Sequence, residues 1–306
     1  MDLSNWMGQS TQLHDRLLTE LRMPGTHDSF SYSVTTKLPL SPDDCSSIVY
    51  KLRGLPCTKT VVKNWAVTQD LDIAGQLSAG ARYVDVRTAY YATDKSFRAI
   101  HGLYGDETQT LLNQVRTWLH AHPKEVVILD FNHFDGFNDD ELLYDHVVAM
   151  IRSTFSNGLL VPPSDLNKLS LNSIYKNPSG GGYVIAIYQS GRGKGREALW
   201  NSMAISSPWA NTSSLSVLFP YLEDHLKSRY MGQLYVAQGV LTPQTADVVK
   251  HLTSTLKYQL AVPCTNAVEK WLQTMSSDLR AKLNIVMVDF VDEVFGRLVI
   301  STNNYA

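Results

Sequence analysis

The hydrophobic positions of the chain follow two alternating patterns, short continuous apolar runs and longer segments with apolar residues three or four positions apart. The short runs are typical of strands that are buried on both faces, and the longer segments of amphipathic helices. Strands are predicted at residues 17–23, 82–87, 97–101, 124–130, 183–188, 205–209, 234–237 and 285–289. Helices are predicted at residues 70–80, 111–119, 142–155, 215–226, 248–256, 268–279 and near 298–300.

Eight strands that alternate with helices predict an α/β fold, a (βα)8 TIM-type barrel that need not be regular. No repeat, low-complexity tract or linker interrupts the alternation, so we expect a single domain over residues 1–306. A long polar connection at residues 31–68 carries no predicted element. We expect this segment to cover the mouth of the barrel, because long loops in compact domains often act as lids.

Composition narrows the class of protein. The chain has 306 residues and a formal net charge of -2, and this balance argues against nucleic acid as the main partner. Its three cysteines have neither paired spacing nor metal-ligand spacing, so a reduced compartment is the default. The sequence shows no secretory leader pattern and no run of eighteen apolar residues, so we expect a cytoplasmic protein without a transmembrane segment.

Residues with catalytic side chains stand where the predicted strands end. In parallel barrels the chemistry lies at the carboxyl ends of the strands, so these residues are expected to meet at one mouth. They are His27 with Asp28, Arg87, His101, Asn132 and Asp289. Each alone has an ordinary explanation, such as a loop histidine capped by a neighbouring carboxylate or an arginine in a surface ion pair. Five strand ends with such residues favour a catalytic site.

Two histidines, nearby carboxylates and an arginine suit the cleavage of a phosphodiester without a redox cofactor. One imidazole can accept a proton from an attacking hydroxyl, and the other can give a proton to the leaving alkoxide. The guanidinium can hold the phosphate through two hydrogen bonds. The short motifs of serine hydrolases, zinc proteases, P-loop enzymes and dinucleotide-binding enzymes do not occur in the sequence.

Six motifs carry a resemblance to a known family. They are Pro24-Gly-Thr-His-Asp-Ser-Phe30, Gly80-Ala-Arg-Tyr-Val-Asp-Val-Arg87, Ile100-His-Gly102, Pro123-Lys-Glu-Val-Val-Ile-Leu-Asp-Phe-Asn-His133, Pro208-Trp-Ala-Asn-Thr212 and Asn284-Ile-Val-Met-Val-Asp-Phe-Val-Asp292. With these motifs the chain resembles the X-domain of phosphatidylinositol-specific phospholipase C, and most closely the vertebrate proteins that consist of this domain alone. The X-domain motifs fall over about residues 17–190, and the likeness extends over nearly the whole chain.

The resemblance implies catalytic roles for five residues. By similarity to the bacterial enzymes, His27 is the general base for the inositol 2-hydroxyl and Asp289 is its partner. His101 is the general acid, and Asp28 is coupled to it. Arg87 stabilises the pentacoordinate phosphate. The reaction implied is cleavage of the glycerol–phosphate bond of inositol phospholipids.

The resemblance is incomplete in a way that bears on metals. The calcium-dependent eukaryotic enzymes carry acidic metal ligands where this chain has Arg87 and Asn132. A cation at Arg87 would repel calcium, so we expect neither a metal nor another cofactor. Asp28 and Asp85 remain, and they keep a weak calcium site open as the alternative.

Further residues near the expected mouth are assigned to substrate binding or have two possible interpretations. The basic glycine-rich stretch at residues 191–196 either contacts additional phosphates or is simply solvated, and solvation is favoured. Four residues beside the mouth, Tyr90, Tyr91, Leu103 and Tyr104, either enter a bilayer interface or pack on the barrel rim, and packing is favoured. The residues assigned to substrate binding are Asn132, Tyr188 and Trp209.

The sequence therefore predicts a cytoplasmic, metal-independent phosphodiesterase of the phospholipase C type that acts on inositol phospholipids at a membrane surface. The family's Y and C2 regions are absent, so membrane targeting would come from the barrel or from a protein partner. Two alternatives stay open. One is a non-catalytic module that binds inositol phospholipids. The other is a metal-dependent glycerophosphodiesterase on the same barrel, which would need an acidic cluster that Arg87 interrupts.

Overall fold

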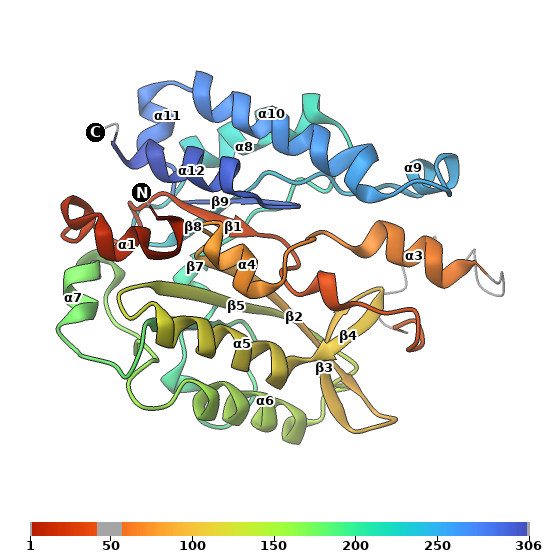
Figure 1. Ribbon diagram of the computed structural model, residues 1–306, viewed down its shortest axis with the longest axis horizontal. Coiled ribbons are helices and arrows are strands. Elements are labelled where there is room, and N and C mark those ends of the chain that lie inside the picture. Colours follow the sequence, from red (N-terminus) through yellow and green to blue (C-terminus); the bar gives the residue numbers. More distant parts are fainter. Residues whose placement is uncertain (1, 42–56, 305–306) are drawn as a thin grey trace.

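The computed structural model describes residues 2–41 and 57–304, and its centre is a sheet that carries helices on both sides (Figure 1). Seven parallel strands of the described chain follow the order β6-β5-β2-β1-β9-β8-β7. They are β1 (Met23–Thr26), β2 (Tyr83–Tyr91), β5 (Val126–Asp135), β6 (Tyr183–Tyr188), β7 (Ile205–Ser206), β8 (Leu234–Gln238) and β9 (Ile285–Val288). Among the described residues no ladder joins β6 to β7, and isolated bridges pair Leu160 with Val184 and Ile187 with Trp200 at this edge of β6. The barrel is therefore irregular at this point.

Alternate residues of each strand point into the barrel and out toward the helices. On the central strands, Tyr83 and Ile285 belong to the interior cluster, whereas Val84 and Val286 pack in the clusters outside it. The interior is closely packed around Gly25 of β1. A Cβ atom at Gly25 would stand 2.9 Å from Ile285 Cγ2 and 3.0 Å from Tyr83 Cδ1. Glycine at this position lets the three central strands approach one another.

Two groups of helices cover opposite sides of the sheet (Figure 1). Helices α5 (Thr108–Ala121) and α6 (Glu141–Thr154) share one apolar cluster with β2, β5 and β6. Helices α8 (Leu215–Lys227), α10 (Val262–Thr274) and α12 (Glu293–Ser301) share a second cluster with β8 and β9. Shorter helices are α1 (Trp6–Gln9), α3 (Thr58–Ala66), α4 (Ile73–Ser78), α7 (Leu171–Tyr175), α9 (Thr245–Lys250), α11 (Ser277–Ala281) and a π-helical turn at Lys257–Ala261.

One predicted barrel strand proves to be part of a hairpin. Strand β3 (Ser96–His101) runs antiparallel to β2 and continues into the antiparallel strand β4 (Leu103–Glu107). Only four residues separate β2 from β3, and a parallel pair needs a crossover of about a dozen residues or more. The count of eight parallel strands is therefore corrected to seven within the described chain. His101 ends an antiparallel strand, which still delivers it to the mouth.

The connection at residues 31–68 also differs from its prediction. Its described part holds a 3-10 turn at Ser31–Ser33 and the helix α3, so it is not without regular structure. Residues 42–56 of the predicted lid lie outside the described residues. In α3, Val61, Val62 and Trp65 are buried, and they fix the helix against its neighbours. None of the described helices has the length and apolar character needed to span a bilayer.

Candidate active site

A cavity of about 600 Å3 opens at the carboxyl ends of the parallel strands. One side of this cavity, which we call the polar wall, is formed by His27, Asp85, Arg87, His101, Asn132 and Asp289. These residues stand on or directly after β1, β2, β3, β5 and β9. Five of them are strand-end residues singled out from the sequence, and the fold brings them to one mouth. Asp85 is the sixth.

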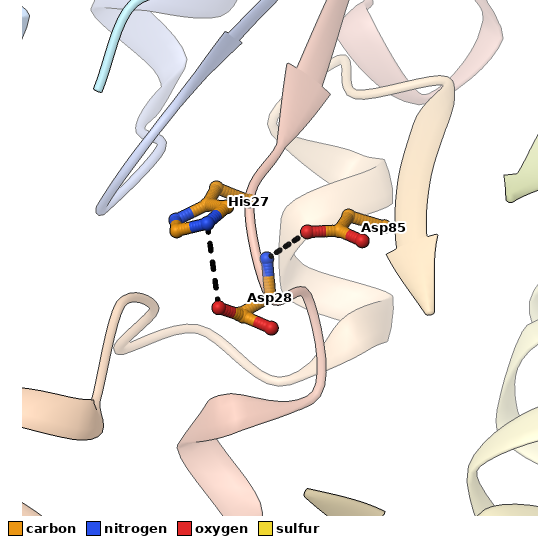
Figure 2. Close-up of side chains that lie close together, drawn as sticks. All are labelled: His27, Asp28 and Asp85. Atoms are coloured by element: carbon orange, nitrogen blue, oxygen red, sulfur yellow. Dashed lines mark hydrogen bonds and ion pairs between the residues drawn. The ribbon is translucent and has the colours of Figure 1, made fainter. Parts of the chain in front are cut away.

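The bend that follows β1 orients the first histidine and carboxylate. It is built on Thr26 and Ser29, whose hydroxyl oxygens lie 2.7 Å apart, rather than on Pro24 and Gly25, which stay inside the strand. Asp28 occupies the left-handed region with φ of 40°, and its N–H donates to Asp85 Oδ2 over 2.8 Å. Figure 2 shows the side chains of His27, Asp28 and Asp85 gathered at this bend.

His27 has a polar partner at each ring nitrogen. Its Nδ1 lies 2.8 Å from Asp289 Oδ1, and its Nε2 lies 3.3 Å from Asp28 Oδ2 and 3.2 Å from Arg87 Nη2. The carboxylate of Asp289 is almost fully buried, so it holds the ring in one orientation. An Nδ1–H that donates to Asp289 leaves the Nε2 lone pair facing the cavity, which is the form that a general base requires.

The charges around His27 stabilise its protonated form. Burial of the ring alone lowers the pKa of His27. The carboxylates of Asp28 and Asp289, together with the hydrogen bond to Asp289, outweigh burial and raise this pKa to about 9. Burial raises the pKa of Asp85, but Arg87 and His27 outweigh it and hold that pKa below its usual value. His27 therefore stays protonated at neutral pH until the charges around its ring change.

Arg87 reaches into the cavity from a bulge in the sheet. The pairing of β2 with β5 shifts register between Val86 and Arg87, and such bulges commonly redirect a side chain. The guanidinium Nε lies 2.5 Å from Asp28 Oδ1, and Nη2 lies 3.6 Å from Asp85 Oδ2. About a fifth of the side chain, 21%, is exposed to the cavity and solvent.

His101 contacts the same carboxylate oxygen of Asp28 as His27 does. Its Nε2 lies 3.2 Å from Asp28 Oδ2, and its Nδ1 donates to the carbonyl oxygen of Ala66 over 2.6 Å. The centroids of the His27 and His101 rings are 6.2 Å apart. Both ring nitrogens of His101 face acceptors, and only the imidazolium form donates from both. This arrangement suits a proton donor.

The three residues assigned to substrate binding have different positions. Asn132 lines the cavity and donates from Nδ2 to Asp85 Oδ1 over 2.8 Å. Trp209 also lines the cavity, with 54% of its surface exposed, and its indole N–H donates to Thr242 Oγ1. Tyr188 is buried in the cluster outside the barrel and contacts the ring of Phe134. The alternation of β6 turns Tyr188 away from the described cavity lining, so its assignment to substrate binding is corrected.

Two positioning residues were missed from the sequence. Thr68 Oγ1 donates to the carbonyl oxygen of His27 over 2.9 Å, and Gln69 Nε2 donates to the carbonyl oxygens of His27 and Val288. Gln69 Oε1 accepts from the N–H of Val291. These bonds join the loops that follow β1 and β9. Because the partners are separated by 41 to 222 residues, no local pattern could reveal them.

Asp85 could have been found from alternation. In the run Tyr83-Val-Asp-Val-Arg87, Val84 and Val86 pack outside the barrel, so Asp85 shares the inward face with Tyr83 and Arg87. A polar residue on the buried face of a strand that ends at an active-site mouth is a functional candidate. Asp85 accepts hydrogen bonds from Asn132 Nδ2 and from the N–H of Asp28, so it fixes these two residues relative to β2.

The donor set does not suit calcium. His27, Asp28 and Asp85 offer ligand atoms within 4.8 Å of one another. Calcium prefers six to eight oxygen ligands, whereas this cluster supplies two carboxylates and an imidazole nitrogen. The guanidinium of Arg87 is already paired with both carboxylates, and its positive charge would oppose a cation there.

Local contacts bear on the two features near the mouth for which the sequence left two interpretations open. In the basic stretch at residues 191–196, Arg192 pairs with Asp139 and Lys194 with Asp145. These charges are therefore matched by neighbouring carboxylates. In the rim, Leu103 and Tyr104 are buried, and Tyr104 packs in a cluster with Ala89 and Ile100. The favoured reading, packing on the barrel rim, is confirmed for Leu103 and Tyr104.

Comparison with known proteins identifies the family of the chain. No protein-family model matches the chain. PI-PLC X domain-containing protein 2 of Mus musculus is 34% identical over 306 residues, which cover 98% of this chain and 88% of that protein. PI-PLC X domain-containing protein 1 of Homo sapiens is 30% identical over 294 residues, which cover 94% and 88%. The chain belongs to the family of PI-PLC X domain-containing proteins. The resemblance inferred from the motifs is confirmed.

Solved structures of PI-PLC enzymes share the fold. The phosphatidylinositol-specific phospholipase C of Listeria monocytogenes superposes with a TM-score of 0.69 at 19% identity, over 99% of both chains. A variant of the Staphylococcus aureus enzyme superposes with a TM-score of 0.66 at 17% identity, over 98% of this chain and 97% of that one. At these identities the likeness concerns the fold alone. It confirms the prediction of an α/β barrel in its distorted form.

Proposed function

We propose that this PI-PLC X domain-containing protein is a phosphodiesterase that cleaves the glycerol–phosphate bond of inositol phospholipids by histidine acid–base catalysis. One observation carries the proposal, which is the convergence of His27, His101 and Arg87 on the carboxylate of Asp28. Two imidazoles and a guanidinium then face one cavity from different strands. This is the minimum set for in-line displacement at a phosphate.

His27 is the proposed base. Its Nε2 accepts the proton of the inositol 2-hydroxyl while that oxygen attacks phosphorus. Asp289, hydrogen-bonded to Nδ1, fixes the tautomer and stabilises the imidazolium that forms. The field of Asp28 and Asp289 favours the cation, so His27 is a strong base once its proton is lost.

His101 is the proposed acid. As the bond from phosphorus to the glycerol oxygen breaks, the Nε2 proton of His101 passes to that oxygen and a diacylglycerol leaves. The bond from Nδ1 to the Ala66 carbonyl keeps the ring aimed at the mouth. Arg87 holds the phosphate oxygens and stabilises the charge that builds on them in the transition state.

The proposal includes the setting of the reaction. Residues 1–306 form one catalytic domain that works in the cytoplasm on a lipid at a membrane surface, without a metal or other cofactor. The donor set at His27, Asp28 and Asp85 supports the metal-independent form, because the cationic Arg87 is already paired with both carboxylates. Asn132 and Trp209, which both line the cavity, are the proposed substrate contacts.

The test is release of water-soluble inositol phosphate from phosphatidylinositol and phosphorylated phosphatidylinositol vesicles by the purified protein. We expect activity that EDTA does not change, and a loss of about a hundredfold or more in both His27→Ala and His101→Ala. Vesicle binding without any product would favour the non-catalytic module. Loss of activity in EDTA that calcium restores would favour a metal-dependent phosphodiesterase.

A further inference from the structure

The cavity has a second side with a different chemistry. This side, which we call the apolar wall, is formed by Val61, Trp65, Leu241, Val248 and Leu256. These side chains come from α3, from the chain after β8, from α9 and from the chain that follows α9. They belong to one contiguous apolar cluster and are between 2% and 8% exposed. The wall is therefore an ordered surface and not a collection of mobile side chains.

An inositol headgroup does not match the apolar wall. Every ring carbon of inositol carries an oxygen, and a hydroxyl buried against hydrocarbon without a partner is destabilised. The polar wall offers donors and acceptors for those oxygens, but the five residues of the apolar wall offer at most the indole N–H of Trp65. A cavity of about 600 Å3 thus combines a site for a polyol phosphate with a site for hydrocarbon.

The proposed acid lies in the same cavity as the helix that carries part of the apolar wall. His101 donates from Nδ1 to the carbonyl oxygen of Ala66, which is the last residue of α3 and lines the cavity itself. The group that receives the proton of His101 is the glycerol oxygen. His101 therefore stands between Asp28 and α3, and the glycerol oxygen that it protonates is released into the cavity that Trp65 and Val61, which precede Ala66 on this helix, also line.

We propose that the apolar wall is a subsite for one hydrocarbon chain of a single lipid molecule, held within the protein while the phosphodiester is cleaved. This inference rests on the proposed function, because it uses His101 to locate the leaving group. It adds a substrate class, namely lipids whose chain enters the cavity, and it makes the chain a determinant of specificity. A headgroup without chains lacks the contacts with the apolar wall.

Two water-soluble substrates test the subsite by catalysis. Dihexanoyl phosphatidylinositol, kept below its aggregation concentration, and glycerophosphoinositol share the headgroup and differ in the chains. Each methylene moved from water to an apolar surface favours binding about fourfold, so kcat/KM should be at least about tenfold higher for the chain-bearing substrate. Equal kcat/KM values for the two substrates, with both cleaved, would overturn the subsite and leave the proposed function standing.

A matched pair of variants on α9 locates the effect. Val248 lines the cavity, whereas Val249 is 54% exposed on the same helix and is not among the described lining residues. Val248→Phe should fill the wall and reduce the ratio of the two kcat/KM values toward one, and Val249→Phe should keep the ratio. Thermal unfolding of both variants shows whether each is folded. Val61→Phe fills the wall from α3 and replaces Val248→Phe if that variant is unfolded.

A binding experiment separates the subsite from catalysis. A single-chain alkyl phosphate with bromine atoms along its chain is titrated below its aggregation concentration, and tryptophan fluorescence is followed. We expect saturable quenching that falls in Trp65→Phe and in Val248→Phe but persists in Val249→Phe. Quenching of this kind in a protein that cleaves neither substrate would remove the proposed function and keep the subsite. Quenching that is unchanged in Trp65→Phe would overturn the subsite.

Discussion

At the scale of single residues, Asp28 is the centre of the candidate site. Its carboxylate contacts His27, His101 and Arg87, and its own N–H donates to Asp85. Its left-handed backbone is held by these contacts, and strained residues of this kind cluster at active sites. One carboxylate thus joins the proposed base, the proposed acid and the proposed phosphate-binding residue in a single set of contacts. The phosphate of a substrate would compete with it for the same cations.

The pH dependence of the reaction follows from His27. The base must be neutral, and its pKa is about 9, so kcat/KM should rise with pH up to about this value. Asp289 raises this pKa by attraction and by its hydrogen bond, so Asp289→Asn should lower it. We expect the rising limb of the kcat/KM profile to move to lower pH in Asp289→Asn, while the maximal rate falls. A limb at the same pH in both proteins would assign it to another group.

Arg87 contributes by geometry as well as charge. Arg87→Lys keeps the positive charge but loses the planar fork that binds a phosphate through two hydrogen bonds. The phosphate gains charge as the transition state forms, so kcat should fall by at least about tenfold while KM changes less. Initial rates over a range of phosphatidylinositol concentrations separate the two constants. A change confined to KM would mean that Arg87 binds substrate and transition state equally well.

At the scale of elements, β1 depends on glycine where it crosses the packed interior. In Gly25→Ala the new methyl would stand 2.9 Å from Ile285 Cγ2 and 3.0 Å from Tyr83 Cδ1. Overpacking of this kind costs about 1–3 kcal/mol, so the variant should unfold at lower temperature or denaturant concentration. Gly191→Ala is the control, because nothing lies within 4 Å of a Cβ there. Equal stability of Gly25→Ala and the parent protein would show that β1 relaxes without strain.

Elements were predictable from the sequence where burial alone determines them. The apolar runs that became β5, β6 and β9 could be read directly, because these strands are buried on both faces. The direction of β3 was mispredicted because the length of its connection to β2, too short for a parallel crossover, was not considered. Helix α3 was missed in a connection whose polar composition hid the spacing of Val61, Val62 and Trp65.

The residues of the candidate site were predictable where they follow directly from the ends of buried strands. Strand ends could be counted, so His27, Arg87 and Asp289 were placed at one mouth from the sequence. Tyr188 was misassigned because its strand face was not considered, and β6 turns it outward. Thr68 and Gln69 were missed because their partners are distant in sequence. Extension of the single-domain prediction to all of residues 1–306 stays a prediction.

At the scale of the whole molecule, one end of the barrel carries the candidate site and the other end carries contacts that stabilise the fold. The carboxyl ends of the strands hold the candidate site, and the amino ends hold a buried ion pair between Arg82 and Glu125. Arg82 directly precedes β2 and Glu125 directly precedes β5. Arg82 also donates to the carbonyl oxygens of Leu3 and Ser4, and Glu125 accepts from the N–H of Gly8. The pair therefore joins the amino-terminal segment to the base of the barrel.

This separation predicts that stability and activity can be changed independently. The side chains of Arg82 and Glu125 are at most 1% exposed, so Arg82→Met leaves a buried carboxylate without its partner. Such a loss costs about 3–5 kcal/mol, and replacing both residues, in Arg82→Met with Glu125→Gln, should recover a large part of it. Denaturant unfolding of the parent protein, the two single variants and the double variant measures the coupling between Arg82 and Glu125.

Below the unfolding transition kcat should stay close to that of the parent protein, because the pair lies at the end of the strands opposite the cavity. Stability losses that simply add would show that Arg82 and Glu125 are not coupled, and a kcat that falls in step with stability would show that the two ends of the barrel are not independent.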